Sequence, residues 1–187
     1  MARPAASPAP LLVRPAIQHM VSFIDALREG YSRDTLRAET PETIAAIAED
    51  PAWFLRLQLD PPTTVVLPDG TTGQRVPETI LWYVEGDEFL GSVHLRHHLN
   101  DTLALWGGHV GYAVRPSAQG RGHASAMLSG MLDHVRVRGD LDRVMLTVNA
   151  KNPASIRVIE KNGGVLADTI PHPWVEGDEG RRYWIAL

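Results

Sequence analysis

The segment from Val114 to Ala124 has residues in an order that suits binding of a phosphate or pyrophosphate. It reads VRPSAQGRGHA: the end of a β-prone run, a turn of small residues, and the start of an amphipathic helix. The first N–H groups of a helix lack partners within it and carry partial positive charge, so an anion can bind there. Gly120 and Gly122 let the backbone approach a ligand, and Arg121 adds charge at the rim. The segment predicts an anion-binding loop; a glycine-rich turn into a helix is the structural alternative.

Two common nucleotide-binding patterns fit this loop poorly. Gly120-x-Gly122-x-x-Ser125 is like the dinucleotide fingerprint, but Ser125 replaces the third glycine. Asp140 precedes the next predicted strand, whereas the acidic residue of that fingerprint ends the strand. No Gly-Lys-Ser or Gly-Lys-Thr follows, which excludes a P-loop. A nicotinamide-dependent enzyme stays an alternative only if the glycine match outweighs this context.

The elements on either side must hold the loop in place. We expect a strand over residues 109–114 before it and a helix over residues 124–135 after it, ended by Gly139. A buried strand over residues 144–148 and a helix over residues 153–161 come next. The loop is therefore expected between a strand and a helix of a strand–helix–strand–helix stretch.

The rest of the chain predicts helices first and β-structure afterwards. The expected elements are an opening strand at residues 11–15, helices at 17–29, 41–50 and 52–59, a brief strand at 63–67, a hairpin of 79–84 with 88–96, a polar link at 99–108, and closing strands at 165–170 and 183–187. The fold class is therefore mixed α/β (α+β), with a central, mostly antiparallel, twisted sheet flanked by helices. Residues 11–187 are expected to form one domain after a flexible, Pro/Ala-rich tail at residues 1–10.

Composition excludes several classes of protein. The 187 residues are 44% hydrophobic, and 18 Lys+Arg against 22 Asp+Glu give a net charge of −4, so no overall positive field attracts nucleic acid or an anionic membrane. There is no apolar run of about 18 residues to span a membrane. The lack of cysteine excludes an acyl-cysteine intermediate and fits a cytoplasmic location. His94, His97 and His98 would face both sides of a strand, so no metal site is predicted.

Two motifs together resemble the GCN5-related N-acetyltransferases (GNAT). Gln119-x-x-Gly122-x-Ala124 is similar to the family's Gln/Arg-x-x-Gly-x-Gly/Ala signature, and residues 110–116 resemble its fourth strand and the step into its pyrophosphate loop. Asn149-x-x-Asn152-x-x-Ser155, followed by residues 160–164, resembles the next strand end, helix and exit. The resemblance covers residues 79–187 and implies the GNAT fold.

The resemblance also implies acetyl-CoA, or another acyl-CoA, as co-substrate between the fourth and fifth strands. Ala113 and Val114 would pair with the pantetheine arm through their main chain, and the N–H of Val114 would donate to the thioester carbonyl. Asn149 and Asn152 would bind cofactor or shape the splay of the strands, while Asn152 as a helix cap is the structural alternative. The cofactor-binding set is completed by Gln119, Gly120, Arg121, Gly122, His123, Ala124, Ser125 and Ser155.

The family's proton-transfer residues are replaced here. His109 stands where the family often has a glutamate, ten residues before Gln119, and it is either a general base or a structural histidine. Ile159 stands where the family often has a tyrosine that protonates the leaving thiolate. Tyr112 and Tyr183 are candidate substitutes, with packing as the alternative role, and solvent is a third source of the proton.

The resulting hypothesis is an N-acetyltransferase that moves an acetyl group to a primary amine by direct attack in a ternary complex. A non-catalytic acyl-CoA-binding domain, serving as a sensor or structural module, is the alternative. The acceptor is expected to be a small-molecule or protein amine, and nucleic acid and membrane are not expected as partners. Exposed edge strands also allow a homodimer.

Overall fold

The computed structural model describes residues 9–33, 39–66 and 70–187. Residues 1–8 of the predicted tail lie outside the described residues. The chain divides into two compact units and passes between them several times. The first consists of Met1–Pro61, Ile80–Ser92 and Ala113–His123, and the second of Pro62–Thr79, Val93–Tyr112 and Ala124–Leu187. The prediction of one domain over residues 11–187 stays a prediction.

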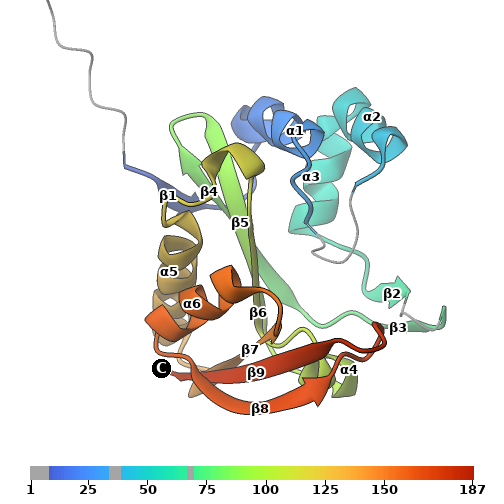
Figure 1. Cartoon of the computed structure of the whole chain (residues 1–187). Coiled ribbons are helices and arrows are strands. Elements are labelled where there is room, and N and C mark those ends of the chain that lie inside the picture. The colour runs from blue at the N-terminus through green and yellow to red at the C-terminus, as the bar shows by residue number, and fades with distance from the viewer. Residues whose placement is uncertain (1–8, 34–38, 67–69) are drawn as a thin grey trace, which may run out of the picture. The chain divides into compact units, whose positions relative to one another are not determined.

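The first unit begins with a short strand and three helices (Figure 1). Proline at the first turn and a polar residue before it start two of the helices. The Thr43 N–H donates to Thr40 Oγ1 (3.2 Å), and the Trp53 N–H donates to Asp50 Oδ1 (2.8 Å). In sequence order these elements are β1 (Leu11–Val13), a 3₁₀ turn (Ile17–His19), α1 (Met20–Arg28), α2 (Pro41–Glu49) and α3 (Pro51–Leu59).

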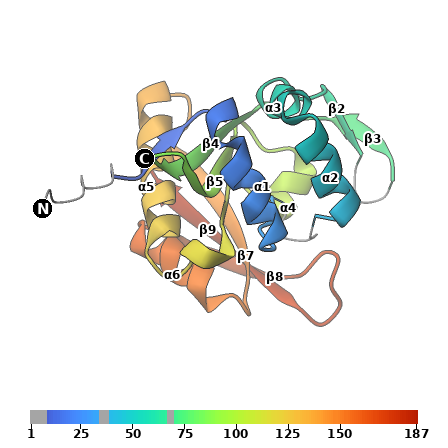
Figure 2. The same cartoon turned by 90° about the horizontal axis from the view of Figure 1, so that it is seen from above.

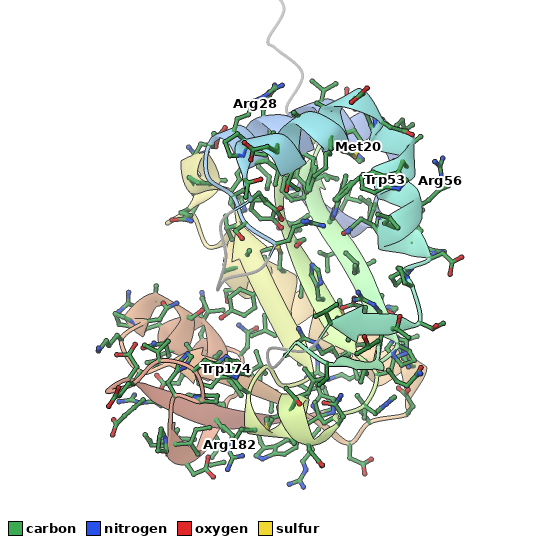
Figure 3. The ribbon with its side chains drawn as sticks, turned by 90° about the vertical axis from the view of Figure 1, so that its right-hand side faces the viewer. Met20, Arg28, Trp53, Arg56, Trp174 and Arg182 are labelled. Carbon is green, nitrogen blue, oxygen red and sulfur yellow. The ribbon has the colours of Figure 1, made fainter. Side chains whose placement is uncertain are left out.

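The core of this unit is aromatic. Phe23 of α1 stacks on Trp82 of β4 (Glu78–Glu85) with ring centroids 4.7 Å apart, and it meets Phe89 of β5 (Glu88–Arg96) edge-on at 5.1 Å. All three rings are almost completely buried, so they hold α1 against the hairpin of β4 and β5. Met20 belongs to the same buried core, and Figure 3 shows it on the inner side of the helices, with Arg28 at their outer surface.

Two larger sheets and a small hairpin form among the described residues. The strand order is β1-β4-β5-β6 in one sheet, where β6 (Val110–Val114) is the edge strand, and β7-β9-β8 in the other. An antiparallel bridge between Gly108 and Leu146 joins the chain just before β6 to β7. The hairpin pairs β2 (Thr64–Val66) with β3 (Thr72–Gln74).

The second unit contains helices and the β7-β9-β8 sheet. Both cartoon views show α6 (Pro153–Lys161) lying along this sheet, and its Ile156 and Ile159 are buried (Figures 1 and 2). The long α5 (His123–Arg138) buries an apolar stripe that includes Met127, Leu128 and Met131. The strands are β7 (Arg143–Asn149), β8 (Val165–Pro171) and β9 (Glu179–Ala186), all paired antiparallel.

The predicted fold class is confirmed, and the element bounds differ in a few places. A short helix, α4 (Asp101–Leu105), forms inside the segment predicted as a polar link. Its cap is Asn100, whose Oδ1 accepts the Leu103 N–H at 2.9 Å. β3 was not predicted, and β9 begins at Glu179, four residues before the predicted start of the last strand, because it pairs with β7 on one side and β8 on the other.

Candidate functional site

The predicted anion-binding loop follows β6 in the first unit. A 3₁₀ turn (Pro116–Ala118) leads to Gly120 and Gly122, whose φ angles of 75° and 86° are in the region that favours glycine. A Cβ placed on either glycine would meet no atom within 4 Å. The positive φ angles therefore favour glycine here, and the space over the loop is open. α5 begins at His123, so its first N–H groups start directly after the second glycine.

Two residues predicted to bind cofactor, Gln119 and His123, contact other residues of the first unit. The Gln119 side chain donates from Nε2 to the Val114 carbonyl (3.2 Å) and so joins the end of β6 to the far side of the turn. The His123 ring lies 5.7 Å from the Tyr83 ring. Arg121 is exposed at the tip. The loop is thus braced internally while its glycines and Arg121 stay accessible.

A buried arginine that the sequence did not single out anchors the start of this loop. Arg115 is only 6% exposed, and its Nη1 donates to Ser22 Oγ (3.1 Å) and to the Phe89 carbonyl (3.1 Å). Its Nη2 and Nε both donate to the Glu29 carboxylate. Ser117 of the 3₁₀ turn donates from its Oγ to the same carboxylate at 2.7 Å. Glu29 therefore ties the loop to the end of α1.

The charge of Glu29 depends on these bonds. Hydrogen bonds from Arg115 and Ser117 lower the pKa of Glu29 from 4.5 to about 2, against the opposing effect of burial. Arg115 also contacts Glu88 at 3.3 Å, but that carboxylate is 55% exposed. The partners of Arg115 lie 26 to 93 residues away in the chain, so no local sequence pattern predicts these contacts.

In the second unit, Tyr112 contacts the start of α6. Its hydroxyl lies 3.1 Å from Ser155 Oγ and donates to the Ser155 carbonyl at 3.3 Å. Burial raises the pKa of Tyr112, so the phenol stays protonated near neutral pH. The Ser155 N–H donates to Asn152 Oδ1 at 3.0 Å, so the expected helix cap is present. The structure brings these three predicted site residues together.

Asn149 and Ser125 have other partners in this unit. The Asn149 amide donates to Asp178 Oδ2 (2.9 Å) and accepts the Lys151 N–H (2.8 Å), which orders the turn after β7. Ser125 Oγ accepts from Asn162 Nδ2 at 3.0 Å. These bonds give Asn149 a structural role in the turn and leave its cofactor role a prediction.

His109 is buried, 6% exposed, beside β7. Its imidazole Nδ1 accepts the backbone N–H of Met145 at 2.9 Å, and the backbone N–H of His109 donates to the Met145 carbonyl at 2.7 Å. Burial lowers the pKa of His109, and the charges of Arg96 and His98 lower it further. The arrangement favours the structural alternative for His109 over a general base.

The other tyrosine candidate is committed elsewhere. Tyr183 is 1% exposed and its hydroxyl donates to Glu160 Oε1 at 3.2 Å. Ile159, at the position of the family's tyrosine, is also 1% exposed and packs inside the protein. Among the described residues, no group of three or more His, Asp or Glu side chains is arranged to hold a metal ion. None of the helices in the described ranges is long and apolar enough to cross a membrane.

Comparison with known proteins gives one family match. The family model described as an acetyltransferase (GNAT) domain matches residues 34–165, more than half of the chain. A search of curated protein sequences finds no match.

Solved acetyltransferase structures share the fold at low sequence identity. The RimL ribosomal L7/L12 α-N-protein acetyltransferase in complex with coenzyme A is 15% identical, with a TM-score of 0.62 over 98% of this chain and 96% of that chain. A chimera of the spermidine N-acetyltransferase SpeG from Vibrio cholerae with hSSAT is 15% identical, with a TM-score of 0.61 over 96% of each chain. The microcin C7 self-immunity acetyltransferase MccE, in complex with acetyl-CoA and AMP, is 12% identical, with a TM-score of 0.62 over 95% of this chain and 92% of that chain.

The family match, the fold shared with these structures and the signature loop before α5 agree, and the chain belongs to the GNAT family of acetyltransferases.

Proposed function

We propose that this protein binds acetyl-CoA, or another acyl-CoA, and transfers the acyl group to a primary amine by direct attack in a ternary complex. The observation that carries the proposal is the loop between β6 and α5, in which two glycines with positive φ precede the helix N-terminus. Solved structures with the same fold were determined with coenzyme A or acetyl-CoA bound, which supports this choice of anion over a nicotinamide cofactor.

The pyrophosphate is assigned to the loop from Gln119 to Ser125. The first N–H groups of α5 donate to it, and a Cβ-free backbone at Gly120 and Gly122 permits close approach. Arg121 supplies charge at the rim. Gln119 serves this loop by bonding the Val114 carbonyl, a bracing role that adds to the one predicted.

The thioester is assigned to the end of β6. Since β6 is the edge strand of its sheet, an extended pantetheine arm can pair with Ala113 and Val114 through main-chain groups. The Val114 N–H then donates to the thioester oxygen, where negative charge develops as the amine attacks. Oriented backbone donors of this kind need no rearrangement during the reaction.

The chemistry is a single displacement. The amine lone pair attacks the thioester carbon, the C–S bond breaks, and the new amide loses a proton to solvent. The chain contains no cysteine, so no acyl-cysteine precedes this step. Tyr112 is assigned as the donor to the leaving thiolate, because its phenol is held protonated and its hydroxyl is oriented by Ser155.

A pair of glycine variants tests the cofactor site. Gly122→Ala and Gly139→Ala place a methyl group at similar positive φ angles, 86° and 70°, and both lie in open space. Gly122 lies in the loop, whereas Gly139 follows α5. At about 100 times its Kd, acetyl-CoA should stabilise the wild-type protein by about 2.7 kcal/mol. We expect acetyl-CoA and CoA, but not NAD, to raise the melting temperature of the wild type and of Gly139→Ala, with a smaller rise for Gly122→Ala.

Turnover separates the enzyme from a non-catalytic acyl-CoA-binding domain. Release of free CoA thiol from acetyl-CoA would be followed with a panel of small amines, polyamines and peptide amino termini. Amine-dependent release supports the transferase, and binding without release for every amine supports the sensor or structural module. A wild-type protein that is folded and shows no shift with acetyl-CoA or CoA overturns the proposal. The cytoplasmic location and a homodimer stay predictions.

A further inference from the structure

His109 takes part in an unusual strand pair with Met145. The bridge between Gly108 and Leu146 is antiparallel, which places His109 opposite Met145 and Gly107 opposite Thr147. In a regular antiparallel ladder, every second pair of opposite residues exchanges two backbone N–H···O bonds, and His109 and Met145 stand at such a position. Here the His109 N–H donates to the Met145 carbonyl (2.7 Å), but the Met145 N–H donates to the imidazole Nδ1 (2.9 Å). The imidazole occupies the place of a backbone acceptor.

The displaced carbonyl is used elsewhere. The His109 C=O accepts the Arg96 N–H at 2.8 Å and therefore belongs to the ladder with β5. Gly107 and Thr147, the pair on the other side of the bridge, also use a side chain as acceptor. The Gly107 N–H donates to the side-chain Oγ1 of Thr147 at 2.8 Å. Pairing with β7 is thus completed by side chains on both sides of the Gly108 bridge. His109 is the residue at which the chain changes its partner from β7 to β5.

The glycine at position 108 permits the close approach of the two segments at this point. A Cβ on Gly108 would lie 2.4 Å from the Met145 carbonyl oxygen, well inside contact distance. Met145 is 4% exposed, so water cannot replace the imidazole as acceptor for its backbone N–H. A buried N–H without a partner is costly, which makes the His109 acceptor necessary to the local structure.

The same bond fixes the protonation of the ring. A neutral imidazole has one lone pair, and here the Met145 N–H occupies it on Nδ1, which leaves the proton on Nε2. The ring then has no free lone pair with which to accept a proton from an amine. Burial and the nearby charges of Arg96 and His98 also favour the neutral form.

We propose that His109 is a positioning residue whose Nδ1 replaces a backbone carbonyl, ends the pairing with β7 and fixes the start of β6. Val114, assigned to the thioester, ends the same five-residue strand, so the direction given at His109 bears on the placement of its N–H. This inference rests on the proposed function for its kinetic consequences, but its structural part can be measured alone.

Two substitutions separate positioning from base catalysis. In His109→Asn the side-chain Oδ1 can still accept the Met145 N–H, but no basic nitrogen remains. His109→Leu fills similar space and offers no acceptor. We expect His109→Asn to keep kcat within about threefold of wild type with an unchanged pH profile, because positioning needs only the acceptor. If His109 were a general base, kcat would fall roughly 10²- to 10⁴-fold in both variants. His134→Asn, the same change at a partly buried histidine of α5, is the matched control.

Amide hydrogen exchange at Met145 provides the structural readout. Exchange should be slow in the wild type and in His109→Asn, and faster in His109→Leu. If His109→Leu does not fold, the Asn variant still decides the question. A folded His109→Asn that binds acetyl-CoA and has lost its activity overturns the inference and leaves the proposed function standing. A wild type that does not bind acetyl-CoA overturns the proposed function, and the exchange rate of Met145 in the Asn variant then decides the role of His109 by itself.

Discussion

Glu29→Gln is the most direct test of how the loop from Gln119 to Ser125, the proposed pyrophosphate site, is anchored. The substitution keeps the shape of the side chain and removes the charge that accepts bonds from Arg115 and Ser117. Arg115 is 6% exposed and would be left with a weaker set of acceptors. We expect a folded but less stable protein, in which the 3₁₀ turn before the glycines is less firmly held.

The magnitude follows from the pKa of Glu29. Lowering it from 4.5 to about 2 corresponds to about 3 kcal/mol of folding free energy if it is fully realised. The Glu29 side chain is 33% exposed, and screening by water reduces this to roughly 1–2 kcal/mol. For a chain of 187 residues such a loss lowers the melting temperature by about 2–8 °C.

The sign of the pH dependence is fixed by the direction of the shift. Because the pKa of Glu29 is lower in the folded state, its stabilisation is fully present above pH 4.5 and is lost as the pH falls toward 2. The melting curves of wild type and Glu29→Gln should therefore differ most near neutral pH and converge in acid. Thermal denaturation followed by circular dichroism between pH 7 and pH 3 measures this difference directly.

Glu88→Gln is the matched control, since Glu88 also contacts Arg115 but through one bond at 3.3 Å and with 55% exposure. Its effect should stay below about 0.5 kcal/mol. Equal effects of the two substitutions, or a Glu29→Gln effect that does not change with pH, would refute the assignment of Glu29 as the anchor.

Three further outcomes are expected. Gly108→Ala should unfold the protein or lower its melting temperature by more than any variant above, because the new Cβ would lie 2.4 Å from the Met145 carbonyl oxygen; thermal denaturation shows this. Asn152→Ala removes the cap of α6 and should cost about 1 kcal/mol in urea unfolding without abolishing acetyl-CoA binding. Tyr112→Phe should lower kcat with little effect on stability and remove the alkaline limb of the pH–rate profile. An unchanged kcat would mean that solvent, and not Tyr112, donates the proton to the leaving thiolate.

Elements with strong local signals were predicted well. The helix at residues 153–161 has the predicted bounds, because Asn152 caps it, Pro153 opens it and two glycines follow it. The turn signal at Gly86 correctly predicted the hairpin of β4 and β5. α4 escaped prediction because five residues show too little periodicity to stand out from a polar loop.

The candidate site was predictable only where its signal is local. The loop from Gln119 to Ser125 carries its signature within seven residues. The partnership of Arg115 with Glu29 joins residues 86 apart, and nothing near either residue announces the other. The sequence allowed both a base and a structural role for His109, since the choice depends on Met145, 36 residues away. Single-sequence patterns do not contain such contacts.

These long-range contacts explain how a loop made of flexible residues can bind a ligand with defined geometry. The glycines to which the proposed function assigns the pyrophosphate also give the loop conformational freedom, which binding must remove at an entropic cost. Arg115, directly after β6, and His109, directly before it, carry side-chain bonds to distant segments, so both ends of the strand are fixed by residues outside the signature. The family signature then needs to supply only the surface that meets the anion. In the proposed function, loss of the Glu29 carboxylate should weaken the binding of acetyl-CoA, because Glu29 holds the loop. Loss of the acceptor at His109, as in His109→Leu, should lower kcat, because His109 directs the strand that ends in the Val114 N–H.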